Sequence, residues 1–565
     1  MIFNSIKKYC SKYLKAEEKQ DDVKYIPEEM LLKQWASSEW VEYQAWIFHK
    51  EFMTLNKWKI MRNESINLVD PPLITIITPS YNTDPAMLRE CIYSVQIQSY
   101  HNWEMCIADD GSTNEDTLAI LREFALEDSR IRVSFSESNQ GICHATNRAL
   151  DMAKGQYVAF LDHDDRLASN ALFCVAQAIC NNRSIDVIYS DRDMLSLRGL
   201  RFMHLFKPDW SPELLFSTNY ICHFLVYRTS LVNKVGGIHH EFEGSQDYDL
   251  ILRVMEMKPV VYHIAKILYH WRQNEQSVSL NHDIKAYAYK AGVLALKHAI
   301  KRRGLEGDVS EILDLWRGHY QVKLAPPSDD SICVIDLDVE LPSDGFVNYI
   351  STKIDAIKDL SYSYIVFISM KLSVDISAVQ EMVSWLQISG VGLVTGKIIN
   401  NDLAILHAGM VQRKNGYPLF IFEGSPESIP GYMGVTRILR NVSAPHPYCF
   451  AIKKSLWDQM DGFDPAFKGP HAVLDLALRA ENERSSGSGA VGRTVYTPFA
   501  KFILKEGESF DPLWIDSDAV YFANKWRDYL SKGDPYYNQH LTLKLNDMGL
   551  NADVGELALA LRSDK

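Results

Sequence analysis

The sequence lacks any uninterrupted apolar run of the roughly eighteen residues that a membrane-spanning helix requires, so we expect no transmembrane segment. It also lacks an apolar stretch after its N-terminal lysines, and we therefore expect no secretory signal. No C-x-x-C pair occurs among its 9 cysteines, several of which lie in apolar runs, where a reduced thiol packs as a small hydrophobe. These absences predict a protein of the reducing cytoplasm.

Positive charge is also scarce. The chain has 59 Lys and Arg against 72 Asp and Glu, a formal net charge of −13, which argues against broad nucleic-acid binding because that requires a basic surface. One segment is an exception, since residues 1–15 contain four lysines, no acidic residue, and apolar residues at helical spacing. A helix over 2–15 has two interpretations: a peripheral anchor on the inner membrane, or a helix that packs on the protein itself.

The 565 residues are enough for two or three domains, and the period of the sequence changes along the chain. Residues 1–70 have a helical pattern. Residues 71–325 alternate β-branched runs with helical patterns, which predicts an α/β domain with a mainly parallel sheet. A stretch rich in Pro, Ser and Asp predicts a linker near 324–331. A second α/β region follows at 326–510, and a helical extension at 511–565.

Polar clusters follow the apolar runs of the first α/β region, among them "PSYN", "ADDGS", "LDHDD" and "YSDRD". In α/β sheets ligands bind beyond the carboxyl ends of strands, so these clusters predict one site at one sheet edge. Asp162 and Asp164 form a D-x-D pair, whose carboxylates raise one another's pKa unless a cation compensates. Mg²⁺ and Mn²⁺ prefer carboxylate and phosphate oxygens, so the pair is a candidate metal site; a solvated acidic turn is the alternative.

The order of these motifs resembles an inverting family-2 glycosyltransferase with the GT-A fold, which is Rossmann-like. The resemblance extends from about residue 73 to 280 and is carried by "TPSYN", "ADDGS", "NQGICHATNRAL", "GQYVAFLDHDDRL", "YSDRD", "FKPDWSPELL", "GSQDYDLILR" and "YHWRQNEQSVS". The variant with "LDHDD", "SQDYDL" and "YHWR" is similar to bacterial transferases of O-antigen, lipopolysaccharide or capsule biosynthesis, rhamnosyltransferases among them.

The resemblance implies roles for the matching residues. Asp247 is the expected catalytic base, and Gln246 replaces a glutamate that many members have before it. Asp164 and His270 are expected to hold Mn²⁺ or Mg²⁺, and Arg272 to contact the donor diphosphate. The expected nucleotide-binding residues are Thr78, Pro79, Tyr81, Asp109, Asp110 and Asp162.

Four further interpretations come from the residues themselves. Asn139 is a polar candidate for the nucleotide site beside a glycine turn, and Trp210 and Trp271 are candidates for stacking on an acceptor sugar, although tryptophans are often core residues. Asp249 is expected to cap or orient the helix that follows it rather than to react.

The expected reaction accounts for these residue types. Departure of a nucleoside diphosphate from the anomeric carbon develops negative charge, which a divalent ion and an arginine stabilise. A carboxylate takes the proton of the acceptor hydroxyl as the new bond forms. One displacement with one base inverts the anomeric centre.

The second α/β region resembles a degenerate copy of the same domain. When "YIVFISMKL" is aligned with "YVAFLDHDD", Ser369 stands at the position of Asp162, and Lys371 replaces the expected metal ligand Asp164. Val473 stands where the expected base would be. The segment before the aligned strand is too short for a nucleotide-binding half. We therefore expect this domain not to catalyse transfer, and to grip the acceptor, brace the first domain or bind a partner.

The sequence thus predicts a cytoplasmic, metal-dependent hexosyltransferase that moves a sugar from a nucleotide-sugar donor to a growing, lipid-linked surface glycan. Two alternatives remain. A sugar-nucleotide pyrophosphorylase shares the fold class, but "PSYN" stands where its glycine- and arginine-rich loop would be. A non-catalytic glycan-binding scaffold fits the second half of the chain better than the first. The donor sugar, the linkage and the oligomeric state have no signal in the sequence.

Overall fold

The computed structural model describes residues 38–196, 198–273, 286–337, 346–357, 360–482, 492–509 and 514–551. The chain divides into two compact units, residues 1–52 with 553–565, and residues 53–552. The described part of the first unit is α3 (Ser38–Trp46) followed by the π-helical η1 (Ile47–Glu51). The basic segment 2–15 lies outside the described residues, so both of its interpretations stand. Within the described ranges, no helix is both long and apolar enough to cross a bilayer.

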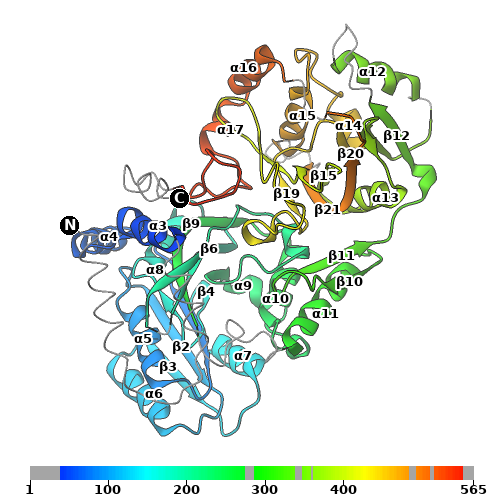
Figure 1. Ribbon diagram of the computed structural model, residues 1–565. Coiled ribbons are helices and arrows are strands. Elements are labelled where there is room, and N and C mark those ends of the chain that lie inside the picture. The colour runs from blue at the N-terminus through cyan, green and yellow to red at the C-terminus, as the bar shows by residue number, and fades with distance from the viewer. Residues whose placement is uncertain are drawn as a thin grey trace, which may run out of the picture. The chain divides into compact units, whose positions relative to one another are not determined.

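The larger unit begins with α4 (Leu55–Ile66), and nine of its described strands then form the first sheet (Figure 1). Their order is β3-β2-β1-β4-β8-β6-β9-β5, with β7 paired to β6. Every residue of β1 and β2 is buried, as expected for strands covered by helices on both faces. The bounds are β1 (Ile74–Ser80), β2 (Trp103–Asp109), β3 (Ile131–Phe135), β4 (Tyr157–Phe160), β5 (Arg166–Leu167), β6 (Val187–Leu195), β7 (Arg201–Leu205), β8 (Leu225–Arg228) and β9 (Val261–Arg272).

Side-chain caps fix where the first helices start. Asp84 accepts hydrogen bonds from the backbone N–H of Ala86 and Met87 at 2.9 and 3.0 Å, and Pro85 occupies the first turn of its helix. Asn114 caps the next helix in the same way. The helices of this domain are α5 (Pro85–Gln96), α6 (Glu115–Glu127), α7 (Ile142–Met152), α8 (Ala171–Asn181), α9 (Thr229–Lys234), α10 (Gln246–Glu256) and α11 (Ala286–Arg302).

The first sheet is mixed, so the expectation of a mainly parallel sheet is wrong. Strands β1 to β4 and the β6–β9 pair are parallel, whereas β8 runs antiparallel to both β4 and β6, and β5 and β7 are antiparallel edge strands. The sheet is mixed mainly because β8 inserts between β4 and β6 and runs antiparallel to both. Strands β6 and β7 pair as antiparallel neighbours with no helix between them, so a pattern of helix-separated strands does not predict β7.

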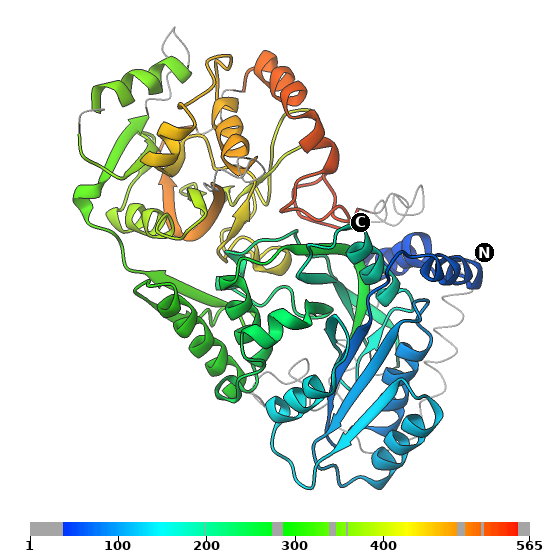
Figure 2. The same ribbon diagram turned by 180° about the vertical axis from the view of Figure 1, so that it is seen from behind.

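A β-hairpin leads from α11 to the second sheet, which Figure 2 shows from behind. The second sheet has the order β12-β13-β20-β15-β21-β14, with β16 paired to β15 and β19 to β21. The strands are β10 (Gly307–Glu311) and β11 (Tyr320–Leu324) in the hairpin, β12 (Ile332–Leu337), β13 (Tyr364–Ser369), β14 (Leu372–Ser373), β15 (Val391–Ile399), β16 (Ile405–His407), β19 (Arg440–Val442), β20 (Cys449–Lys453) and β21 (Arg493–Leu504), with a separate pair β17 (Met410–Val411) and β18 (Leu419–Phe420).

The helices of this part are α12 (Phe346–Ile357), α13 (Ile376–Trp385), α14 (Lys454–Gln459), α15 (His471–Asn482), α16 (Asp516–Lys525) and α17 (Arg527–Lys532). The chain then continues without helix through residues 534–551. The helical pattern expected for the C-terminal extension is therefore present in α16 and α17 and absent from the described residues that follow.

The two sheets share one connectivity. Strands β13, β20, β15 and β21 pair in the same order and with the same directions as β4, β8, β6 and β9. Tyr157 pairs with Arg228, the residue before α9, and Tyr364 pairs with Lys453, the residue before α14. This register sets "YIVF" of β13 against "YVAF" of β4. The described residues of the second sheet contain no counterpart of β2 and β3.

A buried arginine contact also recurs in the two domains. In each, a helical arginine pairs with the aspartate four residues earlier and donates to two backbone carbonyls, one and three residues after a short helix. The contacts of Arg253 are Asp249 at 2.8 Å, Val235 O at 2.6 Å and Gly237 O at 2.8 Å; those of Arg479 are Asp475, Met460 O and Gly462 O, each at 2.7 Å. Asp249 lies inside α10 and pairs with Arg253 of the same helix, so it holds the helix in place and does not cap it.

Candidate active site

The carboxyl ends of β1, β2 and β4 bring the predicted nucleotide-binding residues to one edge of the first sheet. These strands are parallel neighbours, with Ser80 of β1 opposite Asp109 of β2. Thr78 and Pro79 are buried near the end of β1, and the hydroxyl of Thr78 is a buried atom without a hydrogen-bond partner. Tyr81, just beyond the strand, is 45% exposed. The edge therefore offers one unsatisfied polar atom beside an accessible aromatic ring.

The two aspartates that end β2 differ in their contacts. The Asp109 carboxylate accepts hydrogen bonds from the hydroxyl and backbone N–H of Ser112, at 2.5 and 3.0 Å, so both of its oxygens stabilise its own turn. In Asp110, Oδ2 accepts from the N–H groups of Gln140 and Gly141, at 3.0 and 2.8 Å, while Oδ1 is buried and has no partner. A buried oxygen without a donor is costly, and a ligand that donates to Asp110 would remove that cost.

Glycine is required at the turn that faces Asp110. Gly141 has φ +95°, and a Cβ there would lie 2.6 Å from the carboxylate of Glu243. The exposed side chain of Asn139 accepts from the N–H of Gly141 at 3.2 Å, which shapes the same turn. Asn139 therefore contributes to the form of the loop, and its contact with a nucleotide stays a prediction.

An acidic cluster follows β4. One ligand atom each of Asp162, Asp165 and His223 lies within 4.8 Å of the others, which is close enough to share a metal ion. Asp165 is fully buried and accepts hydrogen bonds from the hydroxyl of Tyr269 at 2.5 Å and the N–H of Arg272 at 2.7 Å. Burial, with the charges of Asp164 and Asp162, raises the pKa of Asp165 well above its usual value.

The cluster suits a divalent cation. Two carboxylates and an imidazole are ligands that Mg²⁺ or Mn²⁺ accepts. Burial, with the nearby charges of Arg192 and Lys207, lowers the pKa of His223 well below its usual value, so the ring is neutral and can offer a nitrogen lone pair. This set differs from the predicted ligands Asp164 and His270, whose role as metal ligands stays a prediction.

The two predicted residues of β9 make protein contacts. His270 is 7% exposed, and its Nδ1 lies 2.6 Å from the Asp193 carboxylate on the neighbouring β6. Arg272 is 4% exposed and donates through Nε to the carbonyl of Asp164 at 2.7 Å and through Nη2 to Glu90. Arg272 therefore anchors the D-x-D loop, and its contact with a diphosphate stays a prediction.

Arg192 is a cation that the sequence reasoning did not single out. Its guanidinium lies 4.7 Å from the ring centroid of Trp271, and its Nε is buried without a hydrogen-bond partner. The ring of Trp271 lies 5.9 Å from that of His223, so the arginine stands next to the acidic cluster. The signal was present in "YSDRD", where the period of a strand puts Arg192 on the face opposite to its two neighbouring aspartates.

The predicted base lies at the start of α10. Asp247 accepts a hydrogen bond from Nδ2 of Asn219 at 2.8 Å, and burial raises the pKa of its carboxyl group. Oδ1 of Asn219 is buried without a partner. Gln246 accepts the N–H of Gly244 at 2.8 Å and closes the turn before the helix. Of the two predicted acceptor-binding tryptophans, Trp271 lies beside this site, whereas Trp210 packs against the hydrophobic core.

Comparisons with known proteins identify the first domain. Residues 75–236 match the family model described as glycosyl transferase family 2. The chain contains a family 2 glycosyltransferase domain. Its matched segment includes Asp110, the acidic cluster and Arg192, while Asp247 and β9 lie beyond it.

Two relatives resemble this chain over most of its length. An uncharacterized protein of Sinorhizobium fredii, y4gI, is 31% identical over 546 residues, 86% of this chain and 59% of that protein. The O-antigen biosynthesis protein RfbC of Myxococcus xanthus is 31% identical over 536 residues, 85% of this chain and 41% of that protein. This chain thus spans about half the length of these curated relatives.

A shorter relative aligns with about two fifths of this chain. The Escherichia coli UDP-Glc:alpha-D-GlcNAc-diphosphoundecaprenol beta-1,3-glucosyltransferase WfgD is 29% identical over 216 residues, 38% of this chain and 82% of that protein.

Proposed function

We propose that this chain transfers a hexose from a nucleoside diphosphate sugar to a glycan of the bacterial surface, with inversion at the anomeric carbon. One observation carries the proposal: the unpartnered oxygen of Asp110 and the acidic cluster lie in the segment that matches family 2 glycosyltransferases, and Asp247 follows on α10. The name of RfbC, an O-antigen biosynthesis protein, supports a surface glycan, and the name of WfgD supports a UDP-sugar donor and a lipid-linked acceptor.

The nucleoside of the donor is proposed to bind over the ends of β1 and β2. A donor N–H or ribose hydroxyl would satisfy Oδ1 of Asp110, and the hydroxyl of Thr78 can donate or accept there. Tyr81 would cover the base by stacking. Each contact would either give a hydrogen-bond partner to a polar atom that has none or cover an exposed ring.

Asp162, Asp165 and His223 are proposed to hold Mg²⁺ or Mn²⁺ against the donor diphosphate, with Asp164 and His270 as further candidates. When bound, such an ion stabilises the negative charge of a departing diphosphate. Arg192 would bind the same phosphates through its guanidinium, whose buried Nε has no hydrogen-bond partner, while Trp271 keeps the cation in place.

Asp247 is proposed to accept the proton of the attacking acceptor hydroxyl. Burial raises its pKa, which makes the ionised carboxylate a stronger base than an ordinary aspartate. Asn219 donates to Oδ2 of the carboxylate and holds it at the start of α10. One base on one face of the sugar leads to inversion.

The second domain is proposed to be a non-catalytic copy. The shared register sets Tyr448 before β20 where His223 stands before β8, and α15 carries the buried Val473 in place of an aspartate. Lys371 donates to Ser509 O at 3.1 Å and lies 3.5 Å from the Glu508 carboxylate. Its ammonium is thus engaged within the domain.

Donor binding with metal tests the proposed function directly. A UDP-hexose present at about 100 times its Kd, with Mn²⁺, should stabilise the protein by about 2.7 kcal/mol, which thermal unfolding detects as a rise in Tm. EDTA should remove the metal-dependent part of the rise, and Asp162→Asn should do the same. The matched control is Asp402→Asn, an exposed aspartate of the second domain. A panel of nucleotide sugars without any rise or transfer would overturn the proposal.

Arg192 has its own test. Arg192→Leu should lower kcat about 10²-fold, because one preorganised donor to the developing charge is worth about that much. Arg122→Leu is the matched control, since the exposed Arg122 also covers an aromatic ring, that of Phe135 at 5.6 Å, away from the site. Steady-state kinetics with the donor found above provides the measurement. Equal rates for the two variants would exclude Arg192 from diphosphate binding.

A further inference from the structure

The chain after α17 bridges the two sheet domains of the larger unit. At its start, Asp534 accepts hydrogen bonds from Gln412 N–H at 2.8 Å and Ser443 Oγ at 2.6 Å, both in the second domain. The next residue, Pro535, accepts the N–H of Asp209 in the first domain at 2.8 Å. Two successive residues thus attach the segment to both domains. Through Asp534, the second domain sets the position from which Asn538 reaches the first.

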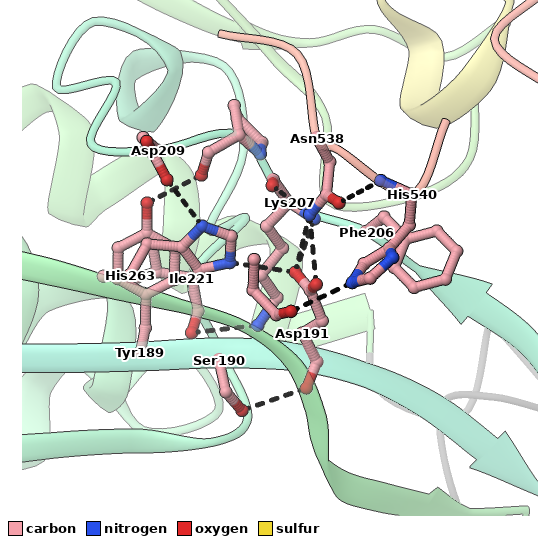
Figure 3. Close-up of polar contacts among 12 residues, drawn as sticks. Tyr189, Ser190, Asp191, Phe206, Lys207, Asp209, Ile221, His263, Asn538 and His540 are labelled. Atoms are coloured by element: carbon pink, nitrogen blue, oxygen red, sulfur yellow. Dashed lines mark hydrogen bonds and ion pairs between the residues drawn. The ribbon is translucent and has the colours of Figure 1, made fainter. Parts of the chain in front are cut away.

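Asn538 contacts two residues that are central to the first domain (Figure 3). Its Nδ2 donates to the carbonyl of Lys207 at 2.8 Å and to the Asp191 carboxylate at 3.0 Å, and its side chain is buried. The Asp191 carboxylate also accepts the N–H of Lys207 at 2.8 Å and lies 2.9 Å from Nε2 of His263. A single amide from the second domain therefore ties Asp191 to the backbone of Lys207.

The Lys207 side chain extends this contact towards the acidic cluster. Lys207 is 0% exposed, and its ammonium donates to three successive carbonyls, those of Ile221, Cys222 and His223, at 3.3, 2.8 and 2.5 Å. Figure 3 shows Lys207 between the Asp191 carboxylate and Ile221. A buried ammonium shared by three carbonyls holds the backbone of a loop that belongs to no helix or strand.

That loop carries two residues of the candidate active site. Asn219, at its start, holds the carboxylate of Asp247, and His223, at its end, belongs to the acidic cluster. We infer that Asn538 and Lys207 are positioning residues, through which the second domain fixes the loop 219–223 for sugar transfer. The inference rests on the proposed function, and it gives a domain without a catalytic carboxylate a defined part in the reaction.

Asn538→Ala and the equally sized Asn538→Asp test the inference. Both variants remove the amide that donates to Asp191 and Lys207. The Asn538→Asp variant also places a second negative charge beside Asp191. We expect kcat to fall about 10–100-fold, the usual cost of losing a supporting contact to site residues. The KM for the donor should change less than about threefold, because the nucleotide contacts on β1 and β2 are untouched. Amide exchange in 219–224 should rise in both variants, while that in β12 and β13 stays unchanged.

Asn546→Ala is the matched control. Asn546 lies in the same C-terminal segment and donates to Glu423 O at 2.9 Å, within the second domain, so its loss should leave kcat and loop exchange unchanged. Wild-type kcat and wild-type loop exchange in both Asn538 variants would overturn the inference, as would a rise of exchange spread evenly over the chain. Lys207→Met is a second test, in which we expect the same rise of amide exchange, confined to this loop. If the wild-type protein were inactive with every donor, only the proposed function would be refuted. Amide exchange would still test whether Asn538 and Lys207 hold the loop 219–223.

Discussion

Replacing Asp247 by asparagine should lower kcat by about 10²–10⁴-fold, the range that a general base contributes. The substitution keeps the shape of the side chain at the start of α10 but removes the carboxylate that takes the acceptor proton. Donor affinity should stay unchanged, since the nucleotide contacts lie on β1 and β2. Single-turnover kinetics and donor binding, measured together, separate the two effects.

The pH dependence of the same step has a definite sign. The base acts only when ionised, so the rate falls as pH drops through the pKa of Asp247. Burial raises that pKa, which places the acidic limb above the value of about 3.9 for a free aspartate. The Asn219 hydrogen bond lowers the pKa of Asp247, so Asn219→Ala should move the limb to still higher pH.

Asp151→Asn is the matched control for Asp247→Asn. Asp151 is an exposed residue of α7, and its loss should leave both kcat and the pH profile intact. A loss of donor binding in Asp247→Asn, without a fall in the rate of the bound donor, would contradict the role of base.

The sequence predicted the edge of the site because that edge depends on local order. Polar residues that end buried, parallel strands must meet at one sheet edge, and Thr78 and Asp110 lie there as expected. Their unpartnered atoms could not be predicted, since hydrogen-bond satisfaction depends on the Gly141 turn, which is distant in sequence.

The sequence did not predict His223 as the third member of the acidic cluster. His223 reaches Asp162 and Asp165 because β8, which begins two residues after it, inserts between β4 and β6. This insertion makes the sheet mixed, and no periodicity in the sequence encodes which strand inserts where. Arg192 was also not predicted from the sequence. It stands out because its buried Nε has no hydrogen-bond partner, which only the three-dimensional structure shows.

The repeated fold separates what holds the domain together from what reacts. The contact of Arg253 with Asp249 recurs in Arg479 and Asp475 with the same three acceptors, so this contact belongs to the fold. The residue two positions before each aspartate differs, Asp247 in one domain and the buried Val473 in the other. A difference at that position against an unchanged framework favours a role for Asp247 in chemistry.

Truncation of Glu213 to alanine should cost about 3–5 kcal/mol of unfolding free energy, the usual price of breaking a buried ion pair. Glu213 lies in the first domain with 2% of its side chain exposed, and it pairs with Arg493 of the second, whose side chain is 13% exposed. Both carboxylate oxygens are engaged, by Nε of Arg493 at 2.9 Å and Nη2 at 2.5 Å, and Asn441 donates a third hydrogen bond at 2.7 Å. Burial lowers the pKa of Arg493, and the charge of Glu213 outweighs it so that the net shift is upward. Because arginine is not deprotonated in proteins, Glu213→Ala leaves a buried charge without this partner.

Urea unfolding measures this loss, with Glu123→Ala as the matched control. Glu123 makes a two-point contact with Arg89 as well, but both side chains are more than 40% exposed, at 42% and 48%, and such surface pairs are worth less than about 1 kcal/mol. The double variant Glu213→Leu with Arg493→Met should recover most of the loss, since it leaves no buried charge unpaired. Equal costs for Glu213→Ala and Glu123→Ala would mean that water reaches the Glu213 pair, and that the contact between the domains depends instead on Asn538 and its neighbours.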